Sequence, residues 1–288
     1  MIVVYGATGS TGTPLVKALV AAGRRVRVVA RDVERARRAV GDGPEFVLGD
    51  IERPGTFGRA LAGAERMYVA VGGPTGTLDL VSAESALIDA ARAAGVRHYV
   101  KVSGVDAHPE GPARIQAIHG AIERHLAASG LPATVLRPNF FMQNFLGLAG
   151  AIRNGALPMP TGVARAALID AGDIARVAER VLTEEGHAGR TYTLTGPESL
   201  SHGDAARVLG EALGRPVQFI DLPGAAFCQG MVEAGLPSWF AELLTDVYVT
   251  AFAAGRAERV TDDVRRVTGA EPRSLAAFAR DHRAAFVG

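Results

Sequence analysis

Three glycines at a spacing of three lie near the start of this chain of 288 residues, and glycines so placed can hold phosphate groups. The turn GATGSTG contains Gly6, Gly9 and Gly12, with the hydroxyl residues Thr8, Ser10 and Thr11 between them. One glycine permits a tight turn, a second lets a pyrophosphate approach the backbone, and a third lets the following helix pack closely. The N–H groups at the start of that helix attract anions. The turn therefore predicts a dinucleotide site, with the three hydroxyls as additional donors.

The elements around this turn are those that such a site requires. Residues 1–5 form a short apolar run typical of a buried parallel strand, and residues 26–30 form a second. Between them, from Pro14 to Gly23, apolar residues recur on one side of a helix. This strand–turn–helix–strand order favours a binding turn over a glycine-rich turn that has no ligand.

The residues after the second and third strands bear on which dinucleotide binds. Arg31 follows the second strand directly and can pair with the 2′-phosphate of NADP(H), which we therefore favour. Asp32 would instead accept hydrogen bonds from ribose hydroxyls, so NAD(H) stays possible. Asp50 follows the third strand, at residues 45–48, and is expected either to accept from the adenine amino group or to cap the helix after Pro54.

Two further strands are expected to end at the same edge of the sheet. Residues 67–71 precede Gly72-Gly73-Pro74, and we expect Val71 and Gly72 to lie against the ribose and pyrophosphate. Residues 98–104 form a fifth strand that ends near Ser103. Ligands of open α/β sheets gather at the carboxyl ends of the strands. The predicted fold class is α/β, a Rossmann-type doubly wound parallel sheet.

Composition excludes several other classes of protein. Net charge is +1 and hydrophobic residues make up 48% of the chain, so no nucleic-acid partner is expected. The one cysteine, Cys228, excludes a disulfide framework, and the histidines lack the spacing of metal ligands. No apolar run reaches the roughly 18 residues of a membrane span, so no membrane partner is expected. The chain begins directly with a strand, which predicts a cytoplasmic protein.

Five later segments add a family resemblance to the glycine turn. They are VKVSGVDA at 100–107, LRPNFFMQN at 136–144, GDIARVAERVL at 172–182, TYTLTGPESLSHGDAARVLGEALGRPVQF at 191–219 and the arginine after the second strand. The chain resembles the NmrA-like branch of the atypical short-chain dehydrogenase/reductases over almost its whole length. The pattern of the sequence changes at Gly147, which predicts a dinucleotide-binding domain over residues 1–146, completed by later segments, and a smaller α/β substrate lobe over residues 147–288.

The resemblance also shows a departure from the wider superfamily, whose enzymes carry a Tyr-x-x-x-Lys pair on the helix after the fifth strand. Alignment on Glu123 puts His119 at the lysine position and Ile115 at the tyrosine position. His119 is therefore a candidate both for catalysis and for cofactor contact, and Ser103 is a candidate to orient a substrate carbonyl. Each could equally serve only in packing or in capping. Lys101, in mid-strand, is expected at an edge with its charge reaching solvent.

The substrate side is expected to begin where the sixth strand, at residues 131–137, ends. The resemblance implies that backbone groups of Pro138 and Asn139 contact the nicotinamide ribose or carboxamide. Candidate walls of the substrate pocket are Phe140, Phe141 and Met142, together with Trp239 from the aromatic-rich second lobe. In that lobe, Asp173 is expected to cap a helix over residues 174–183.

These features favour an NADPH-dependent reductase of an electron-poor quinone, enone, imine or dye, because such acceptors have less need of a strong protein acid. Two alternatives are a non-catalytic NADP(H) sensor, which the missing tyrosine and lysine favour, and a cofactor-assisted isomerase. A small-molecule substrate and a monomer or homodimer are expected.

Overall fold

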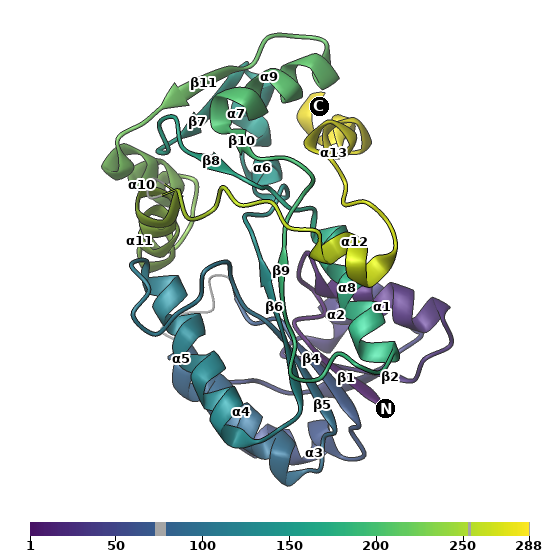
Figure 1. The fold of residues 1–288 in the computed structure, drawn as a ribbon. Coiled ribbons are helices and arrows are strands. Elements are labelled where there is room, and N and C mark those ends of the chain that lie inside the picture. Colours follow the sequence, from purple (N-terminus) through teal and green to yellow (C-terminus); the bar gives the residue numbers. More distant parts are fainter. Residues whose placement is uncertain (73–78, 253–254, 288) are drawn as a thin grey trace.

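A computed structural model describes residues 1–72, 79–252 and 255–287 (Figure 1). Gly73 and Pro74, expected after the fourth strand, and Leu78, expected at the start of the next helix, lie outside these ranges.

A seven-stranded parallel sheet forms the centre of the first lobe (Figure 1). In spatial order its strands are β3 (Glu45–Leu48), β2 (Val26–Ala30), β1 (Ile2–Tyr5), β4 (Arg66–Val69), β5 (His98–Val102), β6 (Ala133–Pro138) and β9 (Thr191–Leu194). The order reverses direction at β1, which makes the sheet doubly wound, as predicted. Every residue of β1 is buried, which explains why its sequence is an apolar run rather than an alternating pattern. β5 is also buried throughout, although it carries His98 and Lys101.

Helices cover both faces of this sheet and form two hydrophobic cores. One face carries α1 (Gly12–Ala21), α2 (Val33–Val40), α8 (Ala171–Thr183) and α12 (Asp263–Thr268). The other carries α3 (Phe57–Leu61), preceded by the single turn η1 (Pro54–Thr56), and the neighbouring helices α4 (Leu80–Ala93) and α5 (Arg114–Ser129).

The second lobe has a separate hydrophobic core beyond the carboxyl ends of the strands (Figure 1). Its helices are α6 (Asn144–Gly147), α7 (Ala149–Arg153), α9 (His202–Leu213), α10 (Gly224–Glu233), α11 (Ser238–Asp246), the π-helix η2 (Val247–Phe252), α13 (Leu275–Asp281) and α14 (Arg283–Val287). Its strands form a parallel pair, β7 (Ala156–Met159) with β11 (Gln218–Asp221), and an antiparallel pair, β8 (Arg165–Ala166) with β10 (Leu200–Ser201).

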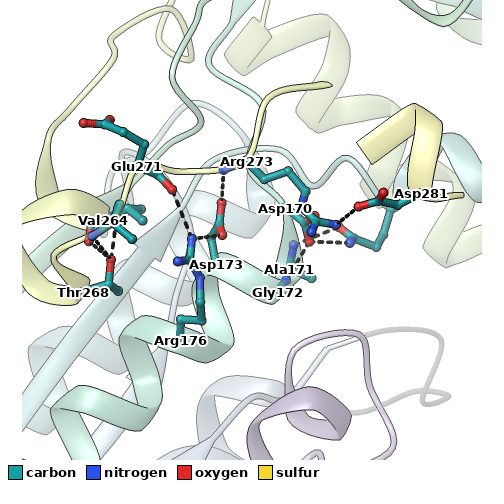
Figure 2. Close-up of polar contacts among 12 residues, drawn as sticks. Asp170, Ala171, Gly172, Asp173, Arg176, Val264, Thr268, Glu271, Arg273 and Asp281 are labelled. Carbon is teal, nitrogen blue, oxygen red and sulfur yellow. Dashed lines mark hydrogen bonds and ion pairs between the residues drawn. The ribbon is translucent and has the colours of Figure 1, made fainter. Parts of the chain in front are cut away.

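Polar contacts fasten the end of the chain to the first turn of α8 (Figure 2). Asp170, not Asp173, is the N-cap of α8, and its carboxylate accepts a hydrogen bond from the N–H of Gly172 at 2.7 Å. The prediction for Asp173 was wrong because the helix begins three residues earlier than expected. Asp173 instead accepts from the N–H of Arg273 at 2.7 Å, and Arg273 pairs with Asp281 at 2.6 Å.

The two lobes are interwoven in sequence. The outermost strand β9 and helices α8 and α12, all from the second half of the chain, belong to the layers of the first lobe. The boundary at residue 147 stays a prediction.

Candidate functional site

The glycine turn is built so tightly that side chains are excluded from two of its positions. Gly6 has a φ of +87°, and a Cβ there would lie 2.1 Å from the carbonyl oxygen of Ala70. A Cβ on Gly12 would lie 2.2 Å from the carbonyl oxygen of Gly6, so only glycine lets α1 approach β1 this closely. Gly9 completes the turn by donating its N–H to the carbonyl of Gly6 at 3.0 Å.

The start of α1 offers free hydrogen-bond donors. Its N-cap residue, Thr11, makes no side-chain capping bond. Within the described part of the chain, the backbone N–H groups of Ser10, Thr11 and Gly12 donate to no partner. Such groups, at the positive end of the helix dipole, bind anions. The turn therefore fits a pyrophosphate through its backbone.

The three hydroxyls of the turn differ in what they can reach. Thr8 and Ser10 are exposed, as a ligand contact requires. Thr11 is buried, and its Oγ1 accepts a hydrogen bond from the hydroxyl of Tyr68 at 2.8 Å. Thr11 thus connects α1 to β4. Its hydroxyl is not one of the exposed donors, although the sequence predicted three of them.

A polar hollow of about 250 Å³, which we call the sheet cleft, opens beside this turn. Its walls are Tyr5, Gly6, Ala7, Thr8, Gly9, Val29, Ala30, Arg31, Asp32, Arg35, Gly49, Asp50, Ile51, Glu52, Ala70, Val71 and Gly72. The cleft therefore brings together residues that the sequence assigned to a cofactor from four separate strand ends. His119, Pro138 and Asn139 do not line it.

Arg31 and Asp32 have different tasks at the cleft. The carboxylate of Asp32 accepts a hydrogen bond from the N–H of Arg35 at 2.8 Å and caps α2. Arg31 and Arg35 are exposed on the cleft wall, and Arg31 forms no ion pair with any residue in the described ranges. The guanidinium of Arg31 favours a phosphorylated ribose over an unmodified one, while Asp32 already uses one carboxylate oxygen to cap α2.

Asp50 lines the cleft rather than capping the next helix. Its Oδ1 accepts from the N–H of Glu52 at 3.1 Å, whereas η1 begins after Arg53 without a side-chain cap. The alternative role in capping is therefore wrong, and contact with the adenine stays a prediction.

Lys101 is fully buried, which corrects the expectation of a solvent-reaching lysine at an edge. β5 is an inner strand between β4 and β6, and α4 and α5 cover this face. The Nζ of Lys101 lies 2.9 Å from both carboxylate oxygens of Glu84, on α4. Burial raises the pKa of Glu84, and the ammonium of Lys101 opposes that rise. The buried charge is thus compensated by a buried partner.

His119 completes this cluster from α5. Its Nδ1 lies 3.5 Å from the Nζ of Lys101. Burial, and then the positive charge of Lys101, lower the pKa of His119 well below its usual value. The ring is therefore neutral at neutral pH, and an ammonium facing Nδ1 places the ring proton on Nε2. His119 can donate a hydrogen bond from Nε2, and its role in catalysis stays a prediction.

The small residue after His119 serves loop packing rather than ligand space. A Cβ on Gly120 would lie 2.1 Å from the carbonyl carbon of His108, because the loop after β5 crosses α5 at this point. The space beside Gly120 is therefore filled by backbone.

Ser103, the residue directly after β5, is held in a second polar cluster. Its hydroxyl donates to Glu123 on α5, and Arg137 at the end of β6 donates its Nε to the same carboxylate at 3.1 Å. Ser103 is buried, and its role in catalysis stays a prediction.

The backbone groups expected to meet the nicotinamide are already used within the protein. The N–H of Asn139 donates to Leu194 at 2.9 Å, and the carbonyl of Pro138 accepts from Val105 at 2.9 Å. The side-chain amide of Asn139 donates to the carbonyl of Ala257 at 2.7 Å. Asn139 therefore joins β6, β9 and the segment around Ala257, and its contact with a cofactor stays a prediction.

A second hollow, of about 450 Å³, lies in the second lobe, and we call it the aromatic cavity. Its walls are Phe140, Phe141, Gln143, Asn144, Phe145, Gly147, Leu148, Pro158, Met159, Leu168, His202, Leu222, Ala226, Phe227, Gly230, Met231, Ala234, Leu236, Leu244 and Tyr248. Its size and apolar lining are typical of small-molecule sites.

Two of the four predicted wall residues line this cavity. They are Phe140 and Phe141, which follow β6. Met142 is buried in the surrounding core, and Trp239 lies outside the cavity with its ring edge-on to Phe240. Trp239 and Leu244 both lie on α11, and it is Leu244 that lines the cavity. Among the residues that the prediction missed are Asn144 and His202, whose polar types gave no apolar signal.

Polar groups are few on the cavity wall, and most of them have partners in the protein. The Nδ1 of His202 lies 2.9 Å from the hydroxyl of Thr161, and burial lowers the pKa of His202 to about 4. The hydroxyl of Tyr248 accepts a hydrogen bond from the Nδ2 of Asn144 at 3.2 Å, and burial raises the pKa of Tyr248 to about 12. Both side chains are therefore neutral at neutral pH.

No helix among the described residues is both long enough and apolar enough to cross a bilayer. The same residues hold no group of three or more metal-ligating side chains.

The fold and the glycine turn agree with the family comparison. Residues 1–275 match the model of the NmrA-like family, and the chain belongs to that family. An NAD(P)H azoreductase of Xenophilus azovorans is 37% identical over 99% of both chains.

Two solved structures cover 98% of this chain and 99% of their own, each at 26% identity. The NADPH-dependent quinone oxidoreductase QOR2 of Escherichia coli, complexed with NADPH, has a TM-score of 0.87. The triphenylmethane reductase of Citrobacter sp., complexed with NADP(H), has a TM-score of 0.86.

Proposed function

We propose that this protein is an NADPH-dependent reductase that transfers hydride to an electron-poor, flat and largely apolar small molecule, of quinone, enone, imine or azo type. One observation carries the proposal: the uncapped start of α1 opens beside a cleft whose wall presents the unpaired Arg31. This pairing of free amides with a free guanidinium suits a pyrophosphate and a 2′-phosphate on one nucleotide. Relatives named as NAD(P)H and NADPH reductases support the same interpretation.

The residues around the cleft would divide the binding of the cofactor between them. Backbone N–H groups of Ser10, Thr11 and Gly12 would hold the pyrophosphate, and Arg31 with Arg35 would hold the 2′-phosphate. The bound nicotinamide would supply the hydride. The neutral His119, on α5, would donate a hydrogen bond from Nε2 to the cofactor. Lys101 and Glu84 would hold its ring in place.

The aromatic cavity would hold the acceptor. Phe140 and Phe141 link it to the end of β6, because they follow that strand after a single residue. Its apolar walls exclude water, and they suit an acceptor whose developing charge is delocalised over a ring system. Such an acceptor reduces the need for the tyrosine acid that this chain lacks at Ile115.

The test mixes the purified protein with NADPH and a panel of quinones, enones, imines and azo dyes, while absorbance of the reduced cofactor is followed. The expected result is oxidation with at least one class and a higher kcat/KM for NADPH than for NADH. Tight NADPH binding without oxidation by any acceptor would contradict the proposal and favour a cofactor sensor.

A further inference from the structure

The aromatic cavity contains one hydroxyl whose proton has no acceptor among the described residues, that of Tyr248. We infer that Tyr248 donates the hydrogen bond that orients the substrate in this cavity. The ligand class is therefore a flat, mostly apolar molecule with an acceptor oxygen or nitrogen at the end that meets Tyr248. The inference deepens the proposed function and relies on it for the identification of the cavity ligand as a substrate.

The other polar side chains of the wall are less suited to this task. Gln143 uses its amide nitrogen on Asp170 at 2.9 Å and its oxygen on the N–H of Ala171 at 2.9 Å. His202 is held through Nδ1 by the hydroxyl of Thr161. Asn144 spends an amide proton on Tyr248 itself. That last bond occupies a lone pair of Tyr248 and leaves its proton available.

Tyr248 is also held rigidly, as an orienting donor must be. It lies in the π-helix η2, a rare form of helix that is often found at functional sites. Its ring stacks on Phe140 with centroids 5.2 Å apart, and Phe227 meets it edge-on at 5.6 Å. Phe140 follows β6 closely, so Tyr248 is fixed to the residue that joins the cavity to the carboxyl edge of the sheet.

Burial keeps the phenol protonated at neutral pH, so Tyr248 acts as a donor and not as a base. An apolar ligand that fills the cavity without an acceptor leaves this buried hydroxyl unpaired. A hydroxyl of this kind selects between molecules of equal shape. No proton transfer from Tyr248 is required.

The test compares two probes of similar shape, 1,4-naphthoquinone, which has acceptor oxygens, and naphthalene, which has none. Dissociation constants are measured with NADP⁺ present, so that no hydride is available. The variant Tyr248→Phe keeps the ring and removes the hydroxyl. We expect it to bind the quinone about 2- to 12-fold more weakly, the range for one neutral hydrogen bond, and to bind naphthalene within about twofold of the unmodified protein.

Two further variants sharpen the test. Tyr192→Phe removes a hydroxyl that bonds His187 outside the cavity and should leave both constants unchanged. Asn144→Asp supplies a carboxylate that accepts the proton of Tyr248, so it should weaken quinone binding while the hydroxyl is still present.

Equal affinities of Tyr248→Phe and the unmodified protein for the quinone would overturn the inference, as would equal losses for both probes. Undetectable binding of the quinone to the unmodified protein would also overturn it. Failure of the proposed function looks different: the unmodified protein would oxidise no NADPH, while its quinone affinity would still depend on Tyr248.

Discussion

The sheet cleft and the aromatic cavity are both hollows at the carboxyl end of the sheet, but they are built from opposite chemistry. The cleft presents backbone amides, glycines and the guanidinium groups of Arg31 and Arg35. The cavity presents aromatic and aliphatic side chains with a few polar groups, among them the hydroxyl of Tyr248. A charged nucleotide can be held by groups that the fold itself supplies, whereas an apolar molecule must be recognised by individual side chains.

The polar groups buried near each hollow show the same contrast. Behind the strand ends, Lys101 and Glu84 pair with each other, and His119 is buried against them. At the cavity, Tyr248 keeps a free proton. The first arrangement fixes geometry, and the second leaves a hydrogen bond for a ligand to complete.

The largest effect is expected from breaking the buried ion pair. Lys101→Met leaves the charge of Glu84 without a partner and should lower the free energy of unfolding by about 3–5 kcal/mol. Denaturant unfolding measures this loss. The double variant Lys101→Met/Glu84→Leu should regain most of it, and a double variant as unstable as the single one would contradict the interpretation.

Acid should lower the stability of the folded protein because His202, beside the aromatic cavity, is buried in its neutral form. In the unfolded chain this histidine takes up a proton below pH 6.5, but in the folded protein only near pH 4. The free energy of unfolding therefore falls as pH is lowered from about 6.5 to 4, by up to about 3 kcal/mol from this group. Unfolding measured across that range should show a smaller loss for His202→Gln. His108→Gln, at an exposed histidine, should keep the full loss.

Charge reversal at the cleft should separate the two nicotinamide cofactors. Arg31→Glu should weaken NADPH binding by about 1–3 kcal/mol and leave NADH nearly unchanged, because only NADPH carries the 2′-phosphate. Calorimetric titration measures both. Arg38→Glu, on α2 but outside the cleft, is the matched control. Equal losses for the two cofactors with Arg31→Glu would remove Arg31 from the phosphate site.

The smallest effect is expected at Trp239, which lies outside the cavity. Trp239→Leu should change the dissociation constant of 1,4-naphthoquinone by less than about twofold, as for substitutions away from a site. A larger loss of quinone affinity in the same titration would indicate that Trp239 belongs to the substrate pocket, as the sequence predicted.

Local sequence patterns predicted the sheet well because the residues that favour a strand lie within the strand itself. Residues 26–30 and 45–48 were predicted to the residue, since runs rich in β-branched and aromatic residues favour strands and glycines or turns end them. The fates of Lys101 and Asp173 were missed because both depend on partners far away in the chain: Glu84 lies on another helix, and Arg273 lies 100 residues later. Nothing in the sequence distinguishes Tyr248 from the other aromatic residues of the second lobe, because its free proton depends on the contact with Asn144.

The attachment of Arg273 to α8 limits how this chain can be shortened. α8 packs against α1, whose first turn borders the proposed phosphate site, so the tail lies two contacts away from that site. Deletion from residue 270 onward would also strip Leu275 and Phe278 from the second core. A truncated version should therefore lose nucleotide affinity and thermal resistance together.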